Sequence, residues 1–229
     1  MAGKVAADPY PFPLNGGFEP ANTALLVIDM QVDFCAPGGY MERSGVDLGP
    51  LRAPIEPIAR ALAAMRRAGF TVVHTRETFR PDLSDVQPHR LFRGADGAAI
   101  VPGDAGPLGR CLIAGEPCWD IIEELTPAAG EAVFDKNGYG AFGTTAIDAH
   151  LKERGIANLV LTGVTTNCCI HSNLREALDR GYDCLVLEDC CGASTRESHE
   201  RSMAIIRSPA GVFGTVSTSD ALLDALGDA

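Results

Sequence analysis

The chain has 229 residues, of which 46% are hydrophobic and 21% are charged, and its formal net charge is −11 at pH 7. This composition is typical of one globular domain of the larger α/β kind. The acidic balance argues against nucleic acid and anionic membrane surfaces as partners, because both require clusters of Lys and Arg. No run of about 18 apolar residues predicts a membrane span, and no signal peptide is evident, so we expect a cytoplasmic protein.

The chain begins with an arm, residues 1–20, that is rich in Pro, Gly and aromatic residues from Asp8 to Pro20. We expect this arm to pack on the surface of the protein or on a neighbouring subunit. Residues 21–229 are expected to form a single domain.

Apolar, β-branched runs alternate with amphipathic stretches through that domain. The expected strands are residues 24–29, 70–74, 131–135, 158–162, 183–187 and 212–216. The expected helices are residues 54–68, 119–125, 144–154, 166–180, 195–207 and 219–226. This alternation predicts an α/β fold of three layers (α/β/α), with a six-stranded, mostly parallel, doubly wound sheet. The long irregular segment 76–116 is expected to serve function, as a lid or a binding loop.

The eight cysteines contain no Cys-x-x-Cys pair and form two adjacent doublets, Cys168–Cys169 and Cys190–Cys191. This spacing fits neither a zinc site nor a secreted disulfide framework. The pattern predicts reduced, mostly buried thiols and leaves room for one reactive cysteine. We also expect no metal and no cofactor.

Three chemically active side chains stand at or just after the ends of expected strands. Asp29 ends the first strand, Lys136 follows the third, and Cys169 lies at the start of the helix after the fourth. Ligands of such sheets bind at the carboxyl ends of the strands. Taken alone, Asp29 fits a helix cap as well as a catalytic role, and Lys136 fits a solvated lysine better than a catalytic one. Together with Cys169, they predict the site of a cysteine nucleophile.

The cysteine doublet follows a strand and a Gly-Val-Thr-Thr turn, at the N-terminus of a helix. The free N–H groups of that turn can stabilise an oxyanion, and the helix N-terminus and Lys136 are expected to lower the pKa of a nearby thiol. Spacing alone does not choose between Cys168 and Cys169.

Three segments carry a resemblance to a known family: LLVIDMQVDF, FDKNGYGAF and GVTTNCCI. In this order they resemble the isochorismatase-like cysteine hydrolases, from about Asn22 to Leu226. The resemblance implies a catalytic set of Asp29, Lys136 and Cys169, with Cys168 outside it. It also implies a cis peptide at Val164–Thr165 and an oxyanion hole formed by the N–H groups of Thr165 and Cys169.

Two branches of that family fit the sequence less well. Nicotinamidases resemble it but carry an Asp-x-His metal set after the second strand, where this chain reads HTRETFRPDLSDVQPH. True isochorismatases lack the nucleophilic cysteine. The presence of Cys169 therefore favours the hydrolysis of an amide bond without a metal.

Within the family the chain most resembles ureide amidohydrolases of the biuret and triuret hydrolase type, through DPYPFPLNG, GEPCWDIIEEL and LEDCCGA. Tyr139 and Pro209 replace a lysine and a glutamine of biuret hydrolases. The resemblance implies cleavage of a small ureide with release of ammonia, through a thioester-like intermediate. Ureidoacrylate, N-carbamoylsarcosine and nicotinamide remain alternative substrates, and a homotetramer is expected.

Five further residues are candidates for substrate binding: Phe34, Tyr139, Phe142, Arg76 and Arg90. The aromatic residues are as readily part of the core, and the arginines, with Arg93, are more often solvated.

Two non-hydrolase interpretations compete with this one. A nucleotide-binding α/β protein needs a glycine-rich turn directly after the first strand, and the glycines here come too late. An interaction module with the same fold would not need the complete Asp, Lys and Cys set.

Overall fold

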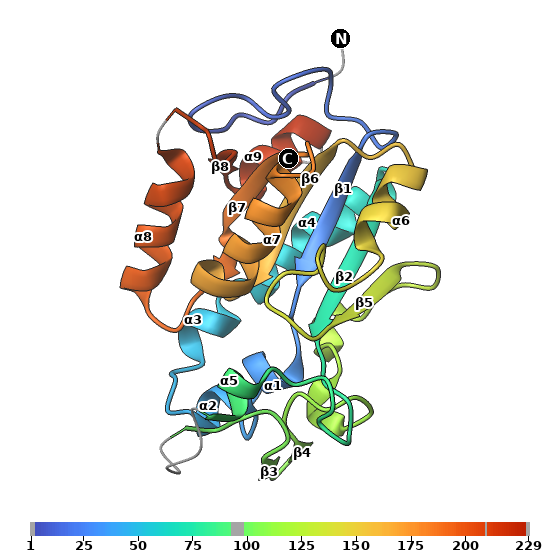
Figure 1. Cartoon of the computed structure of the whole chain (residues 1–229). Coiled ribbons are helices and arrows are strands. Elements are labelled where there is room, and N and C mark those ends of the chain that lie inside the picture. The colour runs from blue at the N-terminus through green and yellow to red at the C-terminus, as the bar shows by residue number, and fades with distance from the viewer. Residues whose placement is uncertain (1–2, 93–98, 209, 228–229) are drawn as a thin grey trace.

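The computed structural model describes residues 3–92, 99–208 and 210–227, and its centre is one six-stranded sheet (Figure 1). In spatial order the strands are β5-β2-β1-β6-β7-β8, and every neighbouring pair is parallel. Their bounds are β1 Thr23–Ile28, β2 Thr71–Glu77, β5 Ala132–Lys136, β6 Asn158–Val164, β7 Asp183–Gly192 and β8 Thr215–Ser217. The strand order reverses between β1 and β6, which is where ligands of doubly wound sheets bind.

Helices cover both faces of the sheet, so the expected three-layer α/β/α fold is confirmed (Figure 1). Helices α4 (Ile55–Arg67) and α9 (Ser219–Leu226) pack on one face, and α6 (Ile147–Glu153), α7 (His171–Leu178) and α8 (Arg196–Arg207) pack on the other. Alternate residues of a strand point to opposite faces. Accordingly, the side chains of the fully buried β1 divide between two hydrophobic cores, one under each helical layer.

Short elements gather beyond the carboxyl ends of the strands (Figure 1). They are α1 Val32–Cys35, α2 Tyr40–Arg43, α3 Gly49–Arg52, α5 Pro88–Phe92, the small hairpin of β3 Ala105–Gly106 and β4 Gly109–Arg110, and the 3-10 turns Pro117–Trp119 and Glu123–Leu125. Asp33 joins two of these segments, because its carboxylate accepts hydrogen bonds from the N–H groups of Tyr40 and Leu112. These segments therefore form a cap over the ends of the strands.

The N-terminal arm packs on its own chain. Asp8 forms an antiparallel bridge with Val216 of β8, and the Tyr10 hydroxyl donates to Asp183 over 2.9 Å. Phe12 is fully buried and its ring contacts Phe18. The arm thus contributes side chains to the core and extends the edge of the sheet.

Several expected bounds differ from the structure. The expected helix 119–125 is wrong, because that segment forms two separate 3-10 turns. The last strand begins at Thr215 rather than at residue 212, since Gly211 and Gly214 turn the chain with positive φ. The helix expected from residue 166 starts with one π-helical turn, Thr166–Ile170, before α7.

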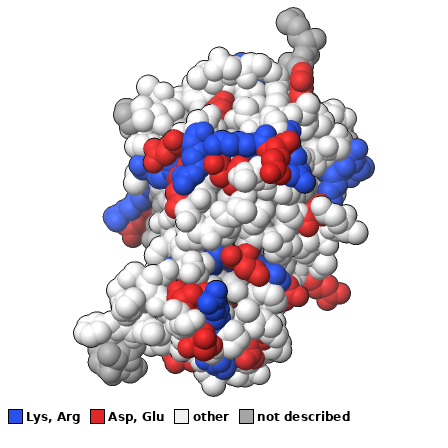
Figure 2. All heavy atoms as spheres, turned by 45° about the vertical axis from the view of Figure 1, so that its right-hand side comes forward, with Lys and Arg blue, Asp and Glu red and all other residues white. Residues whose placement is uncertain are grey.

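None of the described helices is long and apolar enough to cross a membrane. All eight cysteines are unpaired, and all except Cys168 are buried. On the face shown in Figure 2, acidic and basic side chains are interspersed rather than separated into patches of one sign.

Candidate active site

The three strand-end residues singled out in the sequence come together at one edge of the sheet. Asp29 follows β1, Lys136 is the last residue of β5, and Cys169 lies in the π-helical turn after β6. The ammonium of Lys136 lies 2.6 Å from a carboxylate oxygen of Asp29 and 3.7 Å from the sulfur of Cys169. All three residues are buried. They therefore form one contiguous group of charges around a thiol.

Local backbone features hold this group in place. Asp29 has a φ of 53°, which is rare for a residue other than glycine, and its carboxylate accepts a 2.7 Å hydrogen bond from the Thr75 hydroxyl. Gly163, the last residue but one of β6, has a positive φ, and a Cβ atom there would collide with the carbonyl of Ile28. The peptide bond between Val164 and Thr165 is cis. Only glycine at position 163 lets β6 lie this close to β1.

Asn173, on α7, links the nucleophile turn to the loop after β5. Its amide donates to the carbonyls of Cys169 and Tyr139, over 2.8 and 3.3 Å. Its oxygen accepts from the N–H of Ala141 over 2.9 Å. The two segments that carry Lys136 and Cys169 are therefore fastened to each other by one buried side chain.

The charges of the group stabilise a protonated lysine. Burial alone would lower the pKa of Lys136, but the attraction of Asp29, followed by that of Cys169 and Glu77, outweighs it and raises this pKa above its ordinary value. Lys136 thus remains a cation throughout the physiological pH range.

The Cys169 thiol is stabilised in its protonated form, so the expected lowering of its pKa is wrong. A hydrogen bond with Cys168, then burial, raise the pKa of Cys169 well above its ordinary value of 9.0. The carboxylates of Asp29 and Glu77 add to this effect, and Lys136 only partly opposes them. The resting site therefore holds a thiol next to a carboxylate that can accept its proton.

A titration of thiolate absorbance near 240 nm tests this protonation state. The comparison is between Cys168→Ala and the double variant Cys168→Ala/Cys169→Ala, so that Cys169 alone accounts for the difference. Removing Cys168 takes away the largest of the causes that raise this pKa, but burial and the two carboxylates still oppose the anion, so we expect no difference at pH 7 and a difference that grows only at alkaline pH. A full thiolate signal from Cys169 at pH 7 would contradict this assignment.

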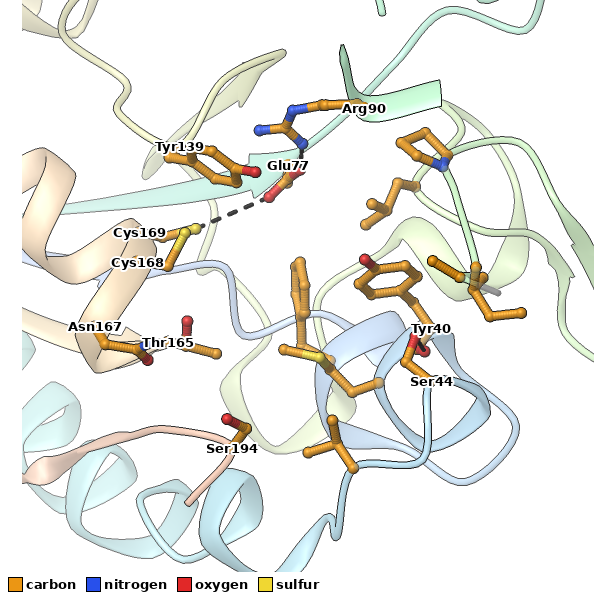
Figure 3. Close-up of a pocket in the computed structure, with 17 residues that line it drawn as sticks. Tyr40, Ser44, Glu77, Arg90, Tyr139, Thr165, Asn167, Cys168, Cys169 and Ser194 are labelled. Carbon is orange, nitrogen blue, oxygen red and sulfur yellow. Dashed lines mark hydrogen bonds and ion pairs between the residues drawn. The ribbon is translucent and has the colours of Figure 1, made fainter. Parts of the chain in front are cut away.

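A cavity of about 330 Å³ opens beside the sulfur of Cys169 (Figure 3). One wall is largely apolar and comes from the cap: Phe34, Tyr40, Met41, Val46 and Leu112. The part nearest the sulfur is polar and is lined by Glu77, Arg90, Thr165 and Asn167. A cavity of this size suits a small molecule with one polar end.

The structure brings three of the five candidate binding residues to the cavity and places the other two elsewhere. Phe34, Tyr139 and Arg90 line the cavity. Phe142 is buried in the core against Tyr182 and does not line it. Arg76 lies over the ring of Trp119 and pairs with Asp120 and Asp135, also away from the cavity. Glu77, the next residue of β2, points to the other side of the sheet and reaches the site instead. Arg93 and Pro209 lie outside the described residues.

That neighbour, Glu77, was missed in the sequence. It ends β2 and is buried, and one of its carboxylate oxygens lies 3.9 Å from the sulfur of Cys169. The expected second strand ended at residue 74, whereas β2 continues to Glu77. Glu77 was therefore not recognised as a charged residue that closes a buried strand, which is the signal that identified Asp29 and Lys136.

Asp29, Glu77 and Cys169 place oxygen and sulfur atoms within 4.8 Å of one another, which is the one such set found among the described residues. These atoms are chemically suited to hold a divalent cation. However, the Lys136 ammonium already provides a positive charge in contact with Asp29 and near the sulfur. We therefore treat Lys136 as the cation of this site.

Residues 23–221 match the sequence model of the isochorismatase domain. The chain belongs to the isochorismatase family. This match covers the six-stranded sheet and all three strand-end residues of the site, and it confirms the resemblance seen in the three motifs.

Two curated members of the family are named ureidoacrylate amidohydrolase RutB. The one from Methylobacterium radiotolerans is 34% identical over 212 residues, which cover 91% of this chain and 81% of the relative. The one from Pantoea ananatis is 32% identical over 220 residues, which cover 92% and 84%. Both relatives are named as amidohydrolases, in agreement with the expectation that this chain is an enzyme that hydrolyses amide C–N bonds.

The fold agrees with solved structures of the family. A cysteine hydrolase from Pseudomonas syringae pv. phaseolicola superposes with a TM-score of 0.77 at 25% sequence identity, covering 97% of each chain. The expected fold class is therefore confirmed over nearly the whole length of this family member.

Proposed function

We propose that this isochorismatase-family hydrolase cleaves a C–N bond of a small ureide, with Cys169 as the nucleophile. The observation that carries the proposal is the group of Asp29, Lys136 and Cys169 beside a cavity of small-molecule size. A thiol, a carboxylate and an ammonium are the parts that acyl transfer through a cysteine requires.

The reaction begins when Asp29 takes the proton of the Cys169 thiol and the sulfur attacks the urea-type carbonyl. The negative oxygen that forms is stabilised by the N–H groups of Thr165 and Cys169, at about 3–4 kcal/mol per donor. Asp29 then returns its proton to the departing nitrogen, which leaves as an amine or ammonia. Water then adds to the thioester carbon and gives one proton to Asp29. The C–S bond breaks, which releases the acid, and Asp29 returns that proton to the sulfur, so that the thiol and the carboxylate are both restored.

Lys136 stabilises the negative charge of the site at each stage of the reaction. Its ammonium stabilises the Asp29 carboxylate before the attack and the developing thiolate during it, because it contacts the one and lies near the other. Its raised pKa means that it does not itself give up a proton at neutral pH.

The names of the two relatives support ureidoacrylate as the first substrate to test. Neutral ureides such as biuret and triuret are a second candidate. Ureidoacrylate carries a carboxylate that needs a positive partner, but Arg90, in the described lining of the cavity, already pairs with Glu77. A neutral ureide needs no such partner.

A substrate panel tests the proposal: ureidoacrylate, biuret, triuret, N-carbamoylsarcosine and nicotinamide, each followed by ammonia release with and without prior EDTA treatment. We expect turnover of at least one ureide, weak or no turnover of nicotinamide, and rates that EDTA leaves unchanged, because Lys136 supplies the cation. Turnover of nicotinamide alone would overturn the ureide assignment. Loss of activity with EDTA, restored by a divalent metal, would overturn the role of Lys136.

A further inference from the structure

Glu77 is held rigidly at the edge of the cavity by Gln31. The N–H of Glu77 donates to the side-chain oxygen of Gln31 over 2.7 Å, and the amide of Gln31 donates back to the carbonyl of Glu77 over 3.1 Å. Gln31 is itself buried and also donates to the carbonyl of Trp119. The backbone of Glu77 is thus fixed relative to the turn that follows Asp29.

The two carboxylate oxygens of Glu77 have different surroundings. Oε1 accepts a hydrogen bond from the guanidinium of Arg90, whereas Oε2 faces the sulfur of Cys169 at 3.9 Å (Figure 3). Arg90 in turn lies over the ring of Tyr139, 4.0 Å from its centre. Arg90 therefore holds the carboxylate with Oε2 directed at the nucleophile and offsets its charge, which leaves Oε2 as a fixed hydrogen-bond acceptor.

A substrate that reacts with Cys169 must bring its carbonyl carbon into contact with the sulfur. The atoms bonded to that carbon then lie within hydrogen-bond reach of Oε2. A ureide carbon carries one oxygen and two nitrogens. The oxygen accepts hydrogen bonds from the N–H groups of the nucleophile turn, and the leaving nitrogen receives a proton from Asp29. The nitrogen that stays on the carbon is therefore the group that can donate a hydrogen bond to Glu77.

We propose that Glu77 is the residue that makes the site selective for carbamoyl groups, by accepting an N–H from the nitrogen that remains on the scissile carbon. This inference rests on the proposed nucleophile and deepens the proposed function. A plain amide or acetyl compound carries carbon at that position, so it leaves a buried carboxylate oxygen without a donor. A buried, charged acceptor that lacks a hydrogen-bond donor costs free energy, and this cost lowers the rate at which the plain amide or acetyl compound reacts.

Two activated esters test this without knowledge of the natural substrate: p-nitrophenyl carbamate and p-nitrophenyl acetate. They share a leaving group and differ only in an NH₂ or a CH₃ on the carbonyl carbon. Nitrophenolate release, corrected for the spontaneous rates, gives kcat/KM for each. We expect the ratio of carbamate to acetate to fall about 10- to 100-fold in Glu77→Gln, with the acetate rate changed little.

A second variant guards against misfolding, because Glu77→Gln leaves Arg90 buried without its partner. In Glu77→Met/Arg90→Met both members of the pair become apolar, a change that proteins often tolerate, and the same fall of the ratio is expected. Ser44→Ala, on the far side of the cavity from Cys169 (Figure 3), is the matched control and should keep the wild-type ratio.

The outcomes separate the hypotheses. An equal loss of both rates in folded Glu77 variants would mean that Glu77 only supports the site, and an unchanged ratio would mean that it contacts no substrate; either result overturns the inference. Wild-type protein that reacts with the carbamate but hydrolyses no ureide of the panel would overturn the proposed function, while the ratio would still test Glu77.

Discussion

Replacing Cys169 with alanine is expected to lower ammonia release from the best ureide by at least about 10⁴-fold, because no covalent intermediate can form without the nucleophile. Steady-state kinetics on the panel substrate measure this loss. The protein should keep its fold, since the change removes one buried sulfur atom and leaves Asp29 and Lys136 paired with each other.

Cys168→Ala is the matched control, because it removes a neighbouring thiol that also lines the cavity. It should retain most of the activity, since Cys168 has no part in the proton transfer between Cys169 and Asp29. The hydrogen bond with Cys168 raises the pKa of Cys169, so its loss makes the thiol somewhat more acidic. Equal losses in the two variants would reassign the nucleophile.

Replacing Asp29 with asparagine should lower kcat by about 10²–10⁴-fold, the range for loss of a general acid–base group. An amide cannot take the proton of the Cys169 thiol, whose pKa is raised. Kinetics in parallel with thermal unfolding measure the effect, because Asp29→Asn also leaves the buried Lys136 without its carboxylate and is expected to destabilise the fold.

Thr75→Val provides the comparison for that variant. It removes the hydroxyl that donates to Asp29 but leaves the carboxylate in contact with Lys136. A smaller loss of kcat than in Asp29→Asn is therefore expected. If Asp29→Asn folds and keeps wild-type kcat, another group must be the base.

The architecture could be predicted because it follows from local patterns. Continuous apolar runs that alternate with amphipathic stretches specify a parallel sheet covered on both faces, and each run ends where a site can form. Asp29, Lys136 and Cys169 stand at or after three such ends. Their meeting at one edge of the sheet was therefore deducible before any distance was known.

The remaining features depend on the tertiary structure. Phe142 and Tyr139 are three residues apart, yet one packs on Tyr182 in the core and the other lines the cavity. Arg76 and Glu77 are adjacent, and only the second reaches the sulfur. The thiol pKa was predicted in the wrong direction because the sequence showed the lysine but not the hydrogen bond between Cys168 and Cys169, the degree of burial or the second carboxylate.

The most direct test of the account is mass spectrometry of the protein quenched with acid during turnover of its best ureide, followed by peptide mapping. We predict a carbamoyl or acyl adduct on the peptide that contains Cys168 and Cys169, located on Cys169 by fragmentation. The adduct should also form in Cys168→Ala and be absent in Cys169→Ala. An enzyme that turns over the ureide while Cys169 stays unmodified under conditions that trap the thioester, or an adduct on Cys168, would contradict the account.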